Sequence, residues 1–166
     1  MMGDAFILRR ARQKAPLVLF DGTVASVLGG TKFIDQIQGG YYEYGVSSSK
    51  LRCLSKGTNY EPNYAYFGFN NAVSTNGYKY LHFTASCDYY AGNHRLGISS
   101  ANTATFSKSE PLGTASSHTV TVDLTNHQGN YYLMFEVYGH GEPEVGALTS
   151  VMQISKIWLD NSDTGS

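Results

Sequence analysis

The sequence predicts an all-β protein, a two-sheet antiparallel jelly-roll β-sandwich. Polar and apolar residues alternate in segment after segment, turn pairs such as Asp21-Gly22 separate the segments, and no stretch shows the 3.6-residue period of a helix. A sheet with one apolar face must be covered, and without helices the cover is a second sheet. An immunoglobulin-type sandwich is the competing topology, but the positions of the cysteines and the tryptophan do not fit its pattern.

We expect nine strands, bounded by alternation and by turn residues such as the pairs Gly29-Gly30 and Gly39-Gly40. The expected strands are Leu17–Phe20, Tyr41–Gly45, Lys50–Ser55, Tyr64–Phe69, Lys79–Asp88, Arg95–Ser99, His118–Leu124, Tyr131–Tyr138 and Val151–Leu159. In the last strand, Met152 and Ile154 share a face with Ile157 only if one extra residue is inserted near positions 155 and 156. This predicts a β-bulge at that point.

The clearest alternation lies in Ser117–Tyr138, where a short turn separates two segments. The residues that share an apolar face are Val120, Val122 and Leu124 before the turn and Leu133, Phe135 and Val137 after it. This pattern predicts a β-hairpin with one buried and one solvated face.

Three parts follow along the chain: an N-terminal arm (1–16), a sandwich domain (17–160) and a polar tail (161–166). The arm holds the apolar run Ala5–Leu8, then four basic residues between Arg9 and Lys14, and it ends at Pro16. It is either a solvated tail or an attachment peptide whose apolar run adds as a strand to a neighbour's sheet edge.

Composition excludes several classes of function. A net charge of −1 lacks the electrostatic attraction that nucleic-acid binding requires, so we expect no nucleic-acid partner. The sequence shows neither a membrane-length apolar run nor a signal peptide. We therefore expect that the protein does not insert into a membrane and that it is made in a cytoplasm. Cys53 and Cys87 lie in phase with apolar residues and are expected to be small buried hydrophobes, with a single disulfide as the alternative.

Two parts of the sequence resemble known proteins. Thr119–Asn126, Gly129–Leu133 and Ile154–Leu159 resemble the last three strands of galactose-binding-like and carbohydrate-binding-module jelly rolls. The opening Gly3–Arg10 resembles the start of small tail-associated proteins in phages of gut Firmicutes. Together the resemblances imply a virion-associated β-sandwich, although the chain lacks the exposed tryptophans of many binding modules.

Aromatic residues near polar ones form the first candidate site. A saccharide binds to aromatic rings beside amides and carboxylates. The candidate glycan-binding residues are Tyr60, Tyr64, Asp88, Tyr89, Tyr90, Asn93, Arg95 and Trp158. The alternative is that these tyrosines lie on solvated faces of the sandwich or in contacts between subunits. Trp158 is expected to point out of the sandwich, covered by a loop, a second subunit or a ligand.

Metal and catalytic sites have weaker support. The loop His140–Glu144 gathers possible ligands, and structural calcium is common in the jelly rolls that the chain resembles, but one loop does not show convergence, so no metal or other cofactor is assigned. Glycoside hydrolysis needs two carboxylates at a set separation, and nothing in the spacing of Asp88, Asp123 and Glu136 selects a pair. We therefore expect no enzyme.

The leading hypothesis is a non-enzymatic structural or adhesion protein of a phage tail, baseplate or fibre. It would be located in the virion, form a homo-oligomer, with a trimer favoured, contact other virion proteins and bind a host-surface glycan in an adhesive role. The alternative is a carbohydrate-binding module that binds a saccharide through tyrosine-rich loops. A small glycan-processing enzyme is the third hypothesis.

Overall fold

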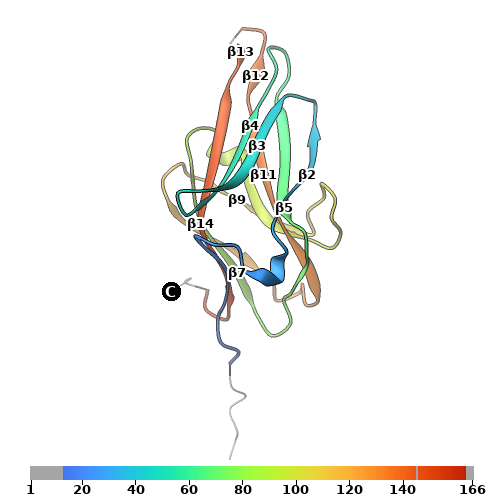
Figure 1. Ribbon diagram of the computed structural model, residues 1–166, viewed down its shortest axis with the longest axis vertical. Helices are drawn as coiled ribbons and strands as arrows, with labels where there is room; N and C mark the ends of the chain where they lie inside the picture. The colour runs from blue at the N-terminus through green and yellow to red at the C-terminus, as the bar shows by residue number, and fades with distance from the viewer. Residues whose placement is uncertain (1–12, 145, 164–166) are drawn as a thin grey trace, which may run out of the picture.

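The computed structural model describes residues 13–144 and 146–163, and strands dominate it (Figure 1). The strands are β1 (Leu17–Asp21), β2 (Thr31–Ile37), β3 (Tyr41–Ser47), β4 (Lys50–Lys56), β5 (Asn63–Phe69), β6 (Val73–Ser74), β7 (Tyr80–Cys87), β8 (Arg95–Ser99), β9 (Lys108–Pro111), β10 (His118–Asp123), β11 (Asn130–Gly139), β12 (Gly141–Glu142), β13 (Gly146–Ala147) and β14 (Thr149–Asp160). Two single 3₁₀ turns, η1 (Ser26–Leu28) and η2 (Ala91–Asn93), complete the regular structure. In the described part of the chain, no helix has the length and apolar character needed to cross a membrane.

The strands form two antiparallel sheets and a small ribbon. Sheet A has the order β10-β7-β14-β4-β3, with β1 also paired to β14. Sheet B has the order β2-β5-β11-β8-β9, with β6 also paired to β11, and β12 pairs with β13. The prediction of an all-β, two-sheet antiparallel sandwich is confirmed.

Alternating side chains from both sheets form the core between them. Phe135 of β11 lies at its centre, and its ring meets those of Phe83 and Phe69 edge to face, each at a centroid distance of 5.7 Å. All three rings are fully buried. Burying such rings supplies the main driving force that holds the two sheets together.

The predicted hairpin in Ser117–Tyr138 is wrong. β10 pairs with β7 in sheet A, whereas β11 pairs with β5 and β8 in sheet B. The connection between them crosses from one sheet to the other, and the Gln128 amide stabilises it by donating to the carbonyls of Tyr78 and Leu124, both at 2.9 Å. Alternation shows which face of a strand is buried, but it does not show which strand is the partner.

The predicted bulge in β14 is confirmed, because the register passes from Ile154 opposite Ala85 to Lys156 opposite Thr84. Two strands of four or more residues, β2 and β9, were not predicted. A bulge between Phe33 and Asp35 interrupts the alternation of β2, and β9 has no apolar side chain other than its terminal proline.

The cysteines lie in one row of sheet A. Cys53 of β4 and Cys87 of β7 both pair with Met152 of β14, one on each side of it, and both thiols are free. Two strand spacings separate their Cα atoms by about 10 Å, which is too far for a disulfide. Cys53 is fully buried, as expected, whereas Cys87 is half-buried.

Candidate functional site

The outer face of sheet B carries aromatic and charged side chains on three neighbouring strands. Tyr64 of β5 is paired with Tyr138 of β11, and in the next outward row Tyr66, Glu136 and Arg95 follow one another across β5, β11 and β8. The residues between them along β5 and β11, such as Ala65 and Val137, are buried in the core. Because strand residues alternate between faces, these five side chains point away from the core.

Tyr138 is the centre of a cluster of four rings, the tyrosine cluster, made of Tyr64, Tyr90, Tyr138 and His140. The Tyr138 ring lies 5.2 Å from that of Tyr64 and 5.3 Å from that of Tyr90. His140 stacks on Tyr90 at 5.0 Å, and its Nδ1 lies 3.1 Å from the Tyr138 hydroxyl. The cluster offers rings and polar atoms on one surface.

Tyr90 reaches the cluster through an unusual backbone. Its φ of 56° lies in the left-handed region, which costs a non-glycine residue about 1–2 kcal/mol. The connection around it is tied on two sides. The Asp88 carboxylate accepts from the Val151 amide at 2.7 Å, and buried His94 accepts the Tyr138 amide on Nδ1 at 3.1 Å and donates from Nε2 to the Tyr89 carbonyl at 2.9 Å.

His94 is therefore a neutral buried base beneath the cluster. Burial lowers its pKa, an effect larger than the opposing influence of the hydrogen bond to the Tyr89 carbonyl and of the Asp88 charge. A neutral ring also fits the geometry, since Nδ1 must be unprotonated to accept the Tyr138 amide.

The loop with Tyr60 lies at the same end of the molecule. A Cβ added to Gly141 would lie 2.1 Å from the Glu61 carbonyl oxygen, so only glycine lets β12 approach this loop so closely. Tyr60 is 75% exposed in the loop. The loop therefore places a further exposed tyrosine ring at the end of the molecule where β12 lies, near His140 of the tyrosine cluster.

A second loop limits how much of the outer face is open. Tyr66 is only 6% exposed, and Phe106, from the connection between β8 and β9, lies against it at a centroid distance of 6.4 Å. Met134, in the next row between Gly68 and Gly97, is fully buried although it is on this face. The open part of the face is thus the end with Tyr64, Tyr138 and Arg95.

The structure gathers most of the predicted glycan-binding residues at this end of the molecule. Tyr64 and Tyr90 belong to the tyrosine cluster, and Tyr89 lies beside Tyr90 at 6.4 Å. Asp88 and Asn93 lie in the same connection as Tyr90, and exposed Arg95 donates to the Ser109 hydroxyl at 3.0 Å.

The prediction did not include Tyr66, Tyr138 and His140. Tyr66 and Tyr138 could have been found from the alternation of β5 and β11, whose even-numbered residues face outward. Glu136 was noted in the sequence only as an outward acid. No local signal brings His140 to Tyr90, because 50 residues separate them.

Trp158 does not join the other predicted residues. It points outward from sheet A, as expected, and its backbone pairs with Val18 and His82. β14 runs from the end of the molecule that carries β12 and β13 to the opposite end (Figure 1). Trp158 lies seven residues beyond Val151, the partner of Asp88, which is about 23 Å along a strand.

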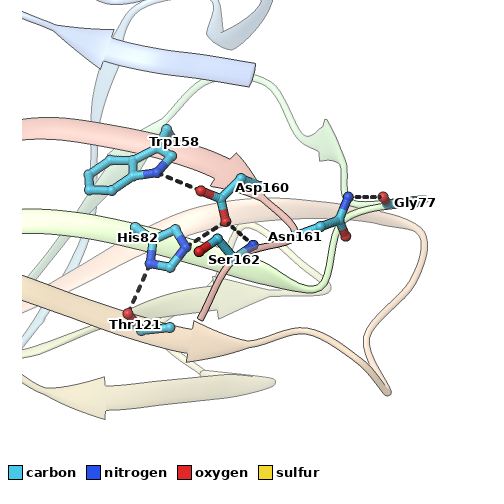
Figure 2. A network of polar contacts seen from close by, with 7 residues as sticks. All are labelled: Gly77, His82, Thr121, Trp158, Asp160, Asn161 and Ser162. Atoms are coloured by element: carbon cyan, nitrogen blue, oxygen red, sulfur yellow. Dashed lines mark hydrogen bonds and ion pairs between the residues drawn. The ribbon is translucent and has the colours of Figure 1, made fainter. Parts of the chain in front are cut away.

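Trp158 instead belongs to a buried polar network on sheet A (Figure 2). The Asp160 carboxylate accepts from His82 Nε2 at 2.8 Å and from Trp158 Nε1 at 3.1 Å. His82 Nδ1 lies 2.9 Å from the Thr121 hydroxyl. Trp158 is 5% exposed, stacks on His82 at 4.9 Å and carries the Lys156 ammonium 4.7 Å above its ring.

The order Thr121, His82, Asp160 has the composition of a nucleophile relay, but the burial argues for a structural role. His82 is fully buried, so its imidazole is out of reach of a substrate. The network joins β10, β7 and β14 across the outer face of sheet A. Within residues 13–144 and 146–163, no group of three or more His, Cys, Asp or Glu side chains could hold a metal ion.

Comparison with known proteins gives a likeness of fold. No protein-family model and no curated protein sequence matches the chain. A mutant family 29 carbohydrate-binding module complexed with cellulohexaose is similar with a TM-score of 0.53 and 9% identity, over 89% of this chain and 92% of that one. A further family 29 structure has a TM-score of 0.52 and 8% identity, over 89% of both chains. At these identities the likeness establishes that the chain folds as the same kind of jelly-roll sandwich.

Proposed function

We propose that this protein is a carbohydrate-binding module that binds a saccharide on the open outer face of sheet B. The observation that carries the proposal is the pair of Tyr64 and Tyr138 rings, 5.2 Å apart, in the row next to Glu136 and Arg95. Sugar rings present apolar C–H faces to aromatic rings, while their hydroxyls pair with carboxylates and guanidinium groups. Three neighbouring strands supply both kinds of group.

The rigidity of this surface also supports binding. Tyr138 and Arg95 are on strands, and the strained Tyr90 is tied to β11 through His94. A surface ordered before binding loses less conformational entropy when the ligand arrives. The likeness to a family 29 module complexed with cellulohexaose makes β-linked glucose chains the first ligand to test.

Calorimetric titration with cellulohexaose, followed by a panel of soluble polysaccharides, tests the proposal. We expect Tyr64→Ala and Arg95→Ala each to weaken binding about tenfold, since one ring or one charged pair contributes about 1–2 kcal/mol. Tyr41→Ala is the matched control, because it removes an exposed tyrosine from sheet A. Absence of binding to every saccharide, or equal losses in all three variants, would contradict the proposal.

The virion role, the trimer and the virion location stay predictions. The arm that would attach the protein to a particle falls mostly in residues 1–12, outside the described residues. Deletion of residues 1–16 tests the attachment: we expect loss of incorporation into particles with the sandwich still folded. Normal incorporation of the shortened chain would refute it.

A further inference from the structure

β3 forms an outer edge of sheet A and pairs only with β4. Its other side therefore presents backbone N–H and C=O groups that no described strand pairs. A groove of about 440 Å³ follows the strand and is lined by residues 42–47 and Arg52. Such a groove has the shape that an added strand requires.

This edge lacks the features that usually prevent strand addition. Edge strands are commonly protected by short length, lysine, proline or a bulge. β9 has four residues and contains Lys108 and Pro111, and β2 contains Lys32 and a bulge. β3 has seven residues in unbroken register and contains neither lysine nor proline, and its one charged side chain, Glu43, is paired with Arg52 of β4.

Apolar side chains are exposed along the same edge. Tyr44 is 40% exposed and Val46 is 46% exposed, although both are on the side of β3 that faces the other sheet. The Tyr44 ring lies 5.6 Å from that of buried Phe67. The core therefore continues to the rim of the sandwich, where a further strand would cover it.

We propose that a second copy of this chain occupies the edge, with β3 running antiparallel to the partner's β3 and Tyr44 opposite the partner's Tyr44. In this register Tyr42 faces the partner's Val46, and the exposed apolar side chains cover one another. The contact is isologous, so it closes as a dimer. The proposed dimer is an alternative to the expected trimer and is independent of the saccharide site on sheet B.

Charge favours this register over the one centred on position 43. On one side Gly45 pairs with Arg52 of β4. On the other side, in the proposed register, it lies opposite the partner's Glu43. The space where a Cβ of Gly45 would stand is open, so Arg52 can reach over it to the partner's Glu43. A slip that centres the pair on position 43 would instead place the two Glu43 carboxylates opposite each other, which is destabilising.

The carboxylate is charged in the single chain. Hydrogen bonds from Tyr41 and Arg52 lower the pKa of Glu43, and the Arg52 Nη1 to Glu43 Oε2 distance is 3.1 Å. A carboxylate has two oxygens and several acceptor positions, so Glu43 can keep its own Arg52 and accept the partner's as well. The dimer would then hold four charges in one alternating network.

Sedimentation velocity over a concentration series of the full chain measures the dimer. We expect a reversible dimer whose dissociation constant rises at least about tenfold in Val46→Lys, because each substitution appears twice in an isologous contact. Val27→Lys is the matched control, since Val27 is 48% exposed but lies in η1 and not on the edge, and it should leave the constant unchanged. A wild-type chain that stays monomeric at about 1 mM, or a dimer that Val46→Lys does not weaken, overturns the proposal.

A charge-swap mixture tests the register. Glu43→Arg and Arg52→Glu should each weaken self-association, because each places like charges across the contact. Mixing the two variants should restore dimers, all of them mixed, since opposite charges then meet only between chains. Failure of the mixture to form mixed dimers would refute the register. Saccharide titration of Val46→Lys separates the two proposals. The variant should bind saccharide as the wild type does, because the tyrosine cluster is not on the β3 edge.

Discussion

Replacing Asp160 with alanine removes an acceptor that two buried side-chain N–H groups share with the half-buried Ser162 amide, which donates to it at 2.9 Å. The carboxylate binds His82 Nε2 at 2.8 Å and Trp158 Nε1 at 3.1 Å, and all three residues are nearly or fully buried (Figure 2). Alanine leaves both partners without a hydrogen bond in a place that water barely reaches. The fold then bears the desolvation cost of two polar groups.

The magnitude follows from that count. A buried polar group left without a partner costs about 1–3 kcal/mol, so two groups give about 2–6 kcal/mol, and we expect a loss near 3 kcal/mol in the free energy of unfolding. For a chain of this size, that loss lowers the thermal midpoint by about 6–12 °C.

Asp160→Asn should cost about 1–2 kcal/mol, less than alanine, because it can keep the hydrogen bonds to His82 and Trp158 but places an N–H group against the Ser162 amide. The asparagine oxygen can accept from Trp158 while its amide donates to His82 Nε2, but that amide then faces the Ser162 N–H, from which Asp160 Oδ1 accepts at 2.9 Å. His82 then carries its proton on Nδ1 and donates it to the Thr121 hydroxyl, 2.9 Å away. The comparison of the two variants therefore shows how much of the loss comes from leaving His82 and Trp158 without an acceptor.

Urea unfolding followed by fluorescence is the assay, because Trp158, the only tryptophan in the sequence, reports on this network directly. Asp123→Ala is the matched control, since it removes an exposed aspartate at the end of β10 that bonds the Thr125 amide. A loss below about 0.5 kcal/mol for Asp160→Ala would refute the reasoning that the network is dry. Equal losses for alanine and asparagine would refute the exchange of the His82 proton.

Three further outcomes are expected. Burial lowers the pKa of His94, and unfolding returns it to about 6.5, so the unfolded chain takes up an additional proton and the stability that His94 contributes is lost as the pH falls below about 6.5. The urea midpoint of His94→Gln should therefore change less than that of the wild type between about pH 7 and pH 5, and an equal change would contradict this. Burial raises the pKa of Cys87 to about 11, so a thiol reagent at about pH 8 should label it only after unfolding, and rapid labelling of the folded chain would count against that assignment. Gly141→Ala would put a Cβ 2.1 Å from the Glu61 carbonyl oxygen, so it should lower the thermal midpoint and displace the loop with Tyr60. Gly92→Ala, where a Cβ meets no atom within 4 Å, should do neither, and similar midpoints for the two variants would refute the close approach.

Much of the fold could be predicted from neighbouring residues because a strand buries every second side chain. The inward sets of β7, β10 and β11 were identified in this way, and the bulge in β14 followed from the shifted phase of Ile157 relative to Ile154. The pairing of β10 with β11 failed because both strands have correct alternation but belong to different sheets.

The candidate site could be predicted only in part, for a related reason. Tyr64 and Tyr90 were identified from their ring chemistry, but Tyr138 and His140, which hold them together, were not. Their contacts with Tyr64 and Tyr90 join residues 48 or more positions apart, and no short segment encodes such a contact. Trp158 shows the reverse case: the sequence placed it outward, whereas the structure separates it from the tyrosine cluster and covers it.

The amino-acid sequence by itself determined the class of fold, the strands with regular alternation and the face that each of them buries, because these depend on hydrophobic contacts read along a few consecutive residues. The tertiary structure alone decided which strands are partners, which outer face gathers rings and charges, and which edge stays unprotected. These depend on contacts between distant segments, whose free energies add up only when the two sheets close on each other.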